Sequence, residues 1–137
     1  MRGTGDTTRY VIDSSAWIEL LEGTPRGDLV RGILADEQND IFTSMLSVAE
    51  VVSVVERSGR SGRRAAEALE SASVLVALDF TLAVSAGLIH AERRGQSMDF
   101  PYGDAAVVAT AKTLRARIVT FDRHFEGQGD ILFLDET

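Results

Sequence analysis

The stretch Arg9-Tyr10-Val11-Ile12-Asp13-Ser14-Ser15 decides the fold. Its short apolar run predicts a buried strand that ends at an acid, and the two serines after the acid can cap a helix. A second run with the same ending, Ile118-Val119-Thr120-Phe121-Asp122, lies near the end of the chain. Helical patterns fill much of the sequence between the two runs, and strands that alternate with helices predict a parallel sheet.

The rest of the chain continues this alternation. We predict helices at residues 16–21, 29–34, 46–57, 63–73, 80–94 and 104–115, and strands at residues 9–13, 41–43, 74–78, 118–121 and 131–134. The fold class is therefore α/β: a three-layer α/β/α domain with a mainly parallel central sheet of about five strands. Residues 1–8 are predicted to form a flexible leader, and residues 9–137 a single domain.

The composition indicates a globular protein of one domain. A chain of 137 residues, 45% hydrophobic and 26% charged, is typical of one globular domain. It has no cysteine, which excludes disulfides, zinc ribbons and thiol catalysis. No apolar run approaches the roughly 20 residues that span a bilayer, and the first residues lack the apolar core of a signal peptide. We therefore expect a cytoplasmic protein with no membrane partner.

The net charge of −7 argues at first against a nucleic-acid partner. Four of the acids are suspected site residues, however, and the balance without them would be −3. Of the 14 basic residues, 13 are arginine and only Lys112 is lysine. Arginine suits phosphate recognition, but this ratio can equally reflect genome composition, so the charge alone decides nothing.

Four acids lie where an apolar run ends or a helix begins: Asp13, Glu50, Asp104 and Asp122. The carboxyl ends of neighbouring parallel strands open onto one crevice, where ligands bind. Carboxylates that converge there repel one another unless a cation lies between them, and the hard cations Mg²⁺ and Mn²⁺ prefer oxygen ligands. Such a pocket is a typical setting for phosphodiester hydrolysis.

Three of these acids also have a local interpretation. Asp13 and Asp122 can be turn or cap residues at strand ends, and Asp104 can be the N-cap of the helix that follows it. Asp99 is a candidate auxiliary acid, although its expected loop position favours a solvated side chain. Four independent caps would not be expected to share one ordered pattern, which favours a common site.

Glu50 has the strongest local alternative. The segment Ser47-Val48-Ala49-Glu50 matches a capping box, in which the glutamate binds the first backbone N–H of its own helix. Ser47, Glu50, Ser53 and Arg57 also recur at helical spacing, which is typical of a solvated stripe. A polar stripe on an otherwise apolar helix must face water, and a metal cleft is one such place.

Four segments, taken in order, resemble the successive motifs of a PIN domain, specifically that of VapC-type toxins of toxin–antitoxin pairs. They are residues 11–20 around Asp13, 44–51 around Glu50, 103–111 around Asp104 and 119–125 around Asp122, and the match spans roughly residues 9–134. The resemblance implies a PIN-like fold and a Mg²⁺- or Mn²⁺-dependent endoribonuclease. It also implies a homodimer that a small VapB-type antitoxin holds inactive.

By motif, the four acids fall on the family's acidic positions, and Thr120 on its accompanying hydroxyl position. Asp13 and Asp104 are the first choices for direct metal ligands, with Ser14 in support. Glu50 and Asp122 would bind a second ion or position water. The long stretch from Gln96 to Gly103, which contains Asp99, departs from the family pattern.

RNA binding requires positive charge near these acids. Arg123 follows a site acid and is the preferred phosphate contact. Arg60 and Arg63 belong to a basic cluster around Gly59 and Gly62, which is either a solvated turn or a clamp for phosphate or antitoxin. His124 is interpreted as a local cap or packing residue.

Other functions remain as alternatives. A non-catalytic PIN-like module that binds RNA or protein is the main alternative, followed by an RNA-processing PIN nuclease that is not a toxin. A haloacid dehalogenase-type phosphatase would need an aspartate where this chain has Ser15. A response-regulator receiver would need paired acids near the first strand and a lysine near the last, whereas Lys112 lies in a predicted helix. Trp17 and Phe125 are expected in the core or a dimer interface rather than as base-stacking platforms.

Overall fold

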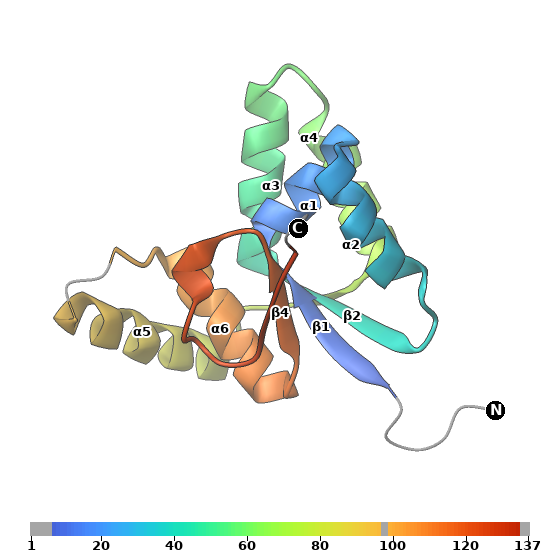
Figure 1. The fold of residues 1–137 in the computed structure, drawn as a ribbon. Coiled ribbons are helices and arrows are strands. Elements are labelled where there is room, and N and C mark those ends of the chain that lie inside the picture. The colour runs from blue at the N-terminus through green and yellow to red at the C-terminus, as the bar shows by residue number, and fades with distance from the viewer. Residues whose placement is uncertain (1–6, 97–98, 135–137) are drawn as a thin grey trace.

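A computed structural model describes residues 7–96 and 99–134 (Figure 1). Its strands are β1 (Thr8–Ile12), β2 (Asn39–Ser44), β3 (Val74–Val76), β4 (Arg117–Thr120) and β5 (Ile131–Phe133). Its helices are α1 (Ser14–Glu22), α2 (Pro25–Ala35), α3 (Met45–Arg57), α4 (Gly62–Ala72), α5 (Phe80–Gly95), α6 (Tyr102–Leu114) and the short 3₁₀ helix η1 (Arg123–Phe125). No helix among the described residues is long and apolar enough to cross a membrane.

The five strands form one parallel sheet in the order β3-β2-β1-β4-β5. The chain therefore builds the sheet outward from β1 in one direction and then resumes on the other side of β1 with β4. Neighbouring strands whose connections leave in opposite directions open a crevice at their carboxyl ends. That crevice lies where β1 and β4 end, and these strands are in register with Ile12 opposite Val119.

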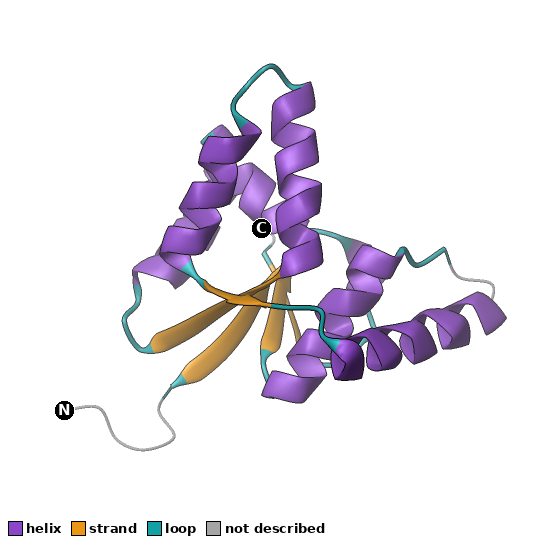
Figure 2. Cartoon of the chain, turned by 180° about the vertical axis from the view of Figure 1, so that it is seen from behind, coloured by secondary structure: helices purple, strands orange, loops and turns teal. Residues whose placement is uncertain are grey.

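Helices cover both faces of the sheet, as Figure 2 shows from behind. Successive strand residues point to opposite faces, so Val11 and Ile118 pack with α5 and α6, while Ile12 and Val119 pack with α1 to α4. Trp17 and Phe125 are buried, as expected of core residues, and the Trp17 indole N–H donates to the Thr43 hydroxyl at 3.1 Å. The predicted three-layer fold with its parallel five-stranded sheet is confirmed.

The boundaries of several elements differ from the predicted ones. Helix α2 begins at Pro25 rather than at the predicted residue 29, because Thr24 caps the helix and proline lacks only an N–H that has no helical partner at that position. The strand predicted to reach Leu78 ends at Val76. Thr8 already belongs to β1, and residues 1–6 of the predicted leader lie outside the described residues.

Gly27 permits the close approach of α1 and α2. A Cβ atom at this position would overlap the backbone carbonyl of Glu19, which cannot move away as a side chain can. We expect Gly27→Ala to lower the free energy of unfolding by about 1–3 kcal/mol. Urea denaturation followed by the fluorescence of Trp17, the single tryptophan, measures this change.

Gly32 in the same helix is the matched control, because a Cβ there would meet no atom within 4 Å. Gly32→Ala should raise the free energy of unfolding by roughly 0.5–1 kcal/mol, since alanine loses less conformational freedom in a helix. Equal effects of the two substitutions would contradict the packing assigned to Gly27.

Candidate active site

Asp13 follows β1 at the crevice and caps the N-terminus of α1. Its carboxylate is buried, and Oδ2 accepts hydrogen bonds at 2.8 Å from the hydroxyls of both Ser15 and Thr120. The other oxygen, Oδ1, is also buried but has no hydrogen-bond partner among the described residues. Two hydroxyls thus fix the orientation of a carboxylate whose second oxygen has no ligand in the protein.

The two hydroxyls also connect the end of β1 to the end of β4. The Phe121 backbone N–H donates to Ser15 Oγ at 3.1 Å, and the Asp122 N–H donates to Thr120 Oγ1 at 2.9 Å. Thr120 lies where its motif predicted a supporting hydroxyl. Ser15 was expected only as a helix cap, and its only signal in the sequence was its place beside Ser14 after the strand.

Glu50 does not form the capping box that its sequence permits. Ser44 caps α3 by accepting from the Leu46 N–H at 3.3 Å, and Ser47 is fully buried with no hydrogen-bond partner for its hydroxyl among the described residues. The half-buried Glu50 side chain instead faces the cavity between α1 and α3 that Ser14 also lines. Its Oε1 is buried and has no hydrogen-bond partner in the described chain.

Gly103 brings α6 against the Glu50 carboxylate. A Cβ atom on Gly103 would lie 2.5 Å from Glu50 Oε2, so a side chain here would displace the carboxylate. This close approach gives the glycine of the Gly103-Asp104 motif a physical role that the sequence did not reveal. It also places the first turn of α6 beside α3.

Asp104 lies in the first turn of α6 and is not its N-cap, contrary to the local interpretation. The helix begins two residues earlier, and Pro101 occupies the cap position without a side-chain hydrogen bond. Asp104 is buried, whereas Asp99 is exposed in the segment that precedes the helix. The carboxylate of Asp104 therefore points toward its acidic neighbours rather than serving the backbone of its own helix.

Asp122 caps η1 and lies beside His124 and Asp104. Its Oδ1 accepts from the His124 backbone N–H at 2.9 Å. The His124 imidazole Nδ1 lies 3.3 Å from Asp122 Oδ1 and 3.9 Å from Asp104 Oδ2. Ligand atoms of these three residues all lie within 4.8 Å of one another, close enough to hold a metal ion. The sequence predicted only a local cap or packing role for His124, and its place beside two acids left no signal there.

The pKa values of three acids are raised because these acids are buried and, for two of them, because they lie near one another. Burial raises the pKa of Asp13, while burial and then the charge of Asp13 raise the pKa of Glu50. The pKa of Asp104 is raised to about 7, first by burial and then by the charges of Asp13, Asp122, Glu50 and Asp99. The crevice therefore concentrates negative charge. Two of its buried carboxylate oxygens, Asp13 Oδ1 and Glu50 Oε1, have no hydrogen-bond partner among the described residues, and carboxylate oxygen is the ligand that hard divalent cations prefer.

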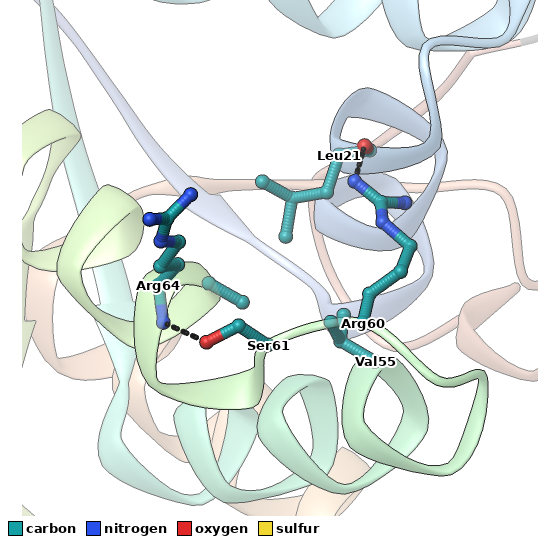
Figure 3. A pocket seen from close by; sticks show the side chains of 6 residues that line it. Leu21, Val55, Arg60, Ser61 and Arg64 are labelled. Carbon is teal, nitrogen blue, oxygen red and sulfur yellow. Dashed lines mark hydrogen bonds between the residues drawn. The ribbon is translucent and has the colours of Figure 1, made fainter.

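Of the three arginines predicted to contact RNA, only Arg123 adjoins one of the four acids. Arg123 adjoins Asp122, and its guanidinium lies over the Phe133 ring at 4.3 Å and within 4.0 Å of Glu126. Arg60 donates to the Leu21 carbonyl at 2.8 Å and lines, with Arg64, a separate cavity of about 370 Å³ (Figure 3). Arg63 is exposed on the first turn of α4. None of the four acids lines the Arg60 cavity.

The family model for the PIN domain matches residues 10–129. The chain belongs to the PIN-domain family. The match includes the ends of β1 and β4 and the parts of α3 and α6 that carry the four acids. No curated protein sequence matches the chain significantly.

Solved PIN-domain neighbours share the fold at low sequence identity. VapBC2 from Rickettsia felis, bound to a DNA fragment from their promoter, has a TM-score of 0.74 at 12% identity, over 93% of this chain and 100% of that chain. A toxin–antitoxin complex from Klebsiella pneumoniae has a TM-score of 0.73 at 20% identity, over 93% and 99%. Mycobacterium tuberculosis VapC20, a sarcin-ricin loop cleaving toxin, has a TM-score of 0.70 at 20% identity, over 88% and 95%.

The raised pKa of Asp104 predicts a pH-dependent stability for this PIN domain without metal. Between about pH 4 and pH 7 the folded protein keeps a proton on Asp104 that the unfolded chain has released, so the free energy of unfolding falls as pH rises through this window. We expect Asp104→Asn to raise the free energy of unfolding above pH 7 by about 2–4 kcal/mol and to flatten this slope.

Urea denaturation in EDTA at a series of pH values measures this effect. Asp28→Asn, which removes an acid whose side chain is 75% exposed, is the control for the loss of one surface charge. A wild-type protein that becomes more stable from pH 4 to pH 7, with Asp104→Asn unchanged relative to it, would contradict the prediction.

Proposed function

We propose that this PIN domain is a Mg²⁺- or Mn²⁺-dependent endoribonuclease and the toxin of a type II toxin–antitoxin pair. The observation that carries the proposal is the Asp13 carboxylate, which is held by two hydroxyls while its buried Oδ1 has no partner among the described residues. A purely structural cap would use both oxygens or expose one of them to water. Membership of the PIN family supports nuclease chemistry at these acids.

The protein residues have distinct roles in this proposal. Asp13 and Asp104 hold the metal directly, and Glu50 and Asp122 hold a second ion or position water. A bound Mg²⁺ or Mn²⁺ lowers the pKa of coordinated water and offsets the charge that develops on the phosphoryl oxygens. Arg123 contacts a phosphate, while Ser14 and Thr120 orient Glu50 and Asp13. His124 completes a group with Asp104 and Asp122 and so adds a candidate ligand.

The toxin assignment rests on the structural neighbours. Several are described as VapBC or as a toxin–antitoxin complex, and one as a toxin that cleaves the sarcin-ricin loop. We expect the chain to form a homodimer, to bind a small VapB-type antitoxin and to act on RNA in the cytoplasm. Phe80, Val84 and Leu88 are exposed at helical spacing along α5 and provide an apolar surface for such an assembly.

Cleavage of RNA is the direct test of the activity. Purified protein should cut RNA in a pool of tRNA and mRNA when Mg²⁺ or Mn²⁺ is present and should not cut it in EDTA. Asp13→Asn should lower the rate by roughly 10²–10³-fold or more, because the neutral amide cannot replace the buried charge. Gel analysis of the pool measures the rate and identifies the target class.

Absence of cutting by the wild type, together with no heat of Mg²⁺ or Mn²⁺ binding in calorimetry, would favour the non-catalytic binding module.

Thr120 provides a second test, because its hydroxyl orients Asp13 without belonging to the acidic cluster. Thr120→Val keeps the shape of the side chain but removes the hydrogen bond to Asp13 Oδ2 and the acceptor for the Asp122 N–H. We expect the affinity for Mn²⁺ to fall about 10–100-fold, as it does when supporting partners of metal ligands are lost. Thr120→Ser should retain most of the affinity, and calorimetry with Mn²⁺ would show equal losses in both variants if the hydroxyl had no such role.

A further inference from the structure

A groove between α1 and α3 begins at the candidate active site and continues along α3. Its cavity of about 440 Å³ includes among its lining residues Ser14, Ile18, Glu50, Ser53, Val54 and Arg57. We call this the α1–α3 groove. Ser14 and Glu50 belong to both the groove and the acidic site, so a ligand bound at the acids has a continuous path into the groove.

The polar stripe predicted on α3 forms one wall of this groove. Ser47, the first member of the predicted stripe, is buried, but Ser53 and Arg57 are exposed and follow Glu50 at intervals of three and four residues. Residues at these intervals lie on one side of a helix. Seven residues of α-helix span about 10 Å, so Arg57 lies roughly two helical turns from Glu50 along the groove.

Arg57 is a cation without an acidic partner in the part of the chain that the structure describes. Its Nε donates to Ser53 Oγ at 3.3 Å, which holds the side chain along the helix. By contrast, the guanidinium groups of Arg31 and Arg117 each lie within 4.0 Å of an aspartate. In a chain with a net charge of −7, an unneutralised arginine beside a groove favours an anionic ligand.

We infer that the α1–α3 groove binds the single-stranded RNA next to the scissile phosphate, with Arg57 on a flanking phosphate. This inference rests on the proposed nuclease function. Arginine binds phosphate oxygens through two parallel N–H groups, and Ser53 orients the guanidinium for that contact. Ile18 and Val54 supply an apolar wall against which a base can pack.

The observations favour RNA over an acidic protein segment. The groove leads directly to acids that would act on a phosphodiester. Only Ile18, Ala49 and Val54 are apolar among its lining residues, which is fewer than the row of apolar anchors along which an amphipathic helix docks. An extended RNA strand can place one phosphate at the metal site and another at Arg57 at the same time.

Equilibrium binding of a fluorescent single-stranded oligoribonucleotide tests this inference in the full chain, with Asp13→Asn present throughout to prevent cleavage. Arg57→Gln should weaken binding roughly tenfold, because it removes a charged hydrogen bond to phosphate. The slope of log affinity against log salt should become shallower by about 0.7, the value for one phosphate contact on a single strand. Arg57→Lys should retain the slope because it retains the charge.

Arg31→Gln is the matched control, since it removes an exposed arginine of α2 that does not line the groove. Equal RNA affinities of the parent, Arg57→Gln and Arg31→Gln would overturn the inference. Loss of binding to a polyglutamate peptide in Arg57→Gln, with RNA affinity unchanged, would assign the groove to an acidic protein partner and would also overturn it. RNA binding is measured separately from cleavage. Failure of the nuclease assay would therefore contradict the proposed function without deciding whether the groove binds RNA.

Discussion

The burial of the Asp13 carboxylate constrains the whole of the candidate site. A charged group can stay buried only where hydrogen bonds or an opposite charge replace water. Two hydroxyls do so at one oxygen of Asp13, and they come from the start of α1 and the end of β4. The parallel sheet order, with β4 beside β1, is what brings Thr120 within reach of Asp13. The other acids then gather around a side chain whose position the backbone has already fixed.

The sequence predicted the sheet and its acids because both leave local signals. Strands covered on two faces are continuous apolar runs, and Asp13 and Asp122 follow such runs directly. The relation between distant side chains leaves no such signal. Three such relations depend on how the helices dock on the sheet. Ser15 supports the site as well as Ser14, Gly103 contacts Glu50, and His124 lies beside Asp104.

Local rules failed where tertiary contacts competed with them. The capping box at Glu50 is satisfied in sequence, yet Ser44 caps α3 and Glu50 faces the cavity that Ser14 also lines. Asp104 has the residue type of an N-cap but lies in the first turn, where its carboxylate still benefits from the positive end of the α6 dipole. In both cases the acid faces the crevice rather than capping its own helix, a departure from local rules of the kind that candidate functional residues show.

The raised pKa of Asp104 couples the candidate metal site to the acidity of the solution. With a pKa raised to about 7, this carboxyl keeps its proton to a much higher pH than an ordinary aspartate when no cation is present. A cation that binds through Asp104 must displace that proton, so binding releases protons and its apparent affinity weakens as the solution becomes more acidic. A modest fall in pH would thus lower the occupancy of this candidate site by a cation, even at a constant cation concentration and with the fold unchanged.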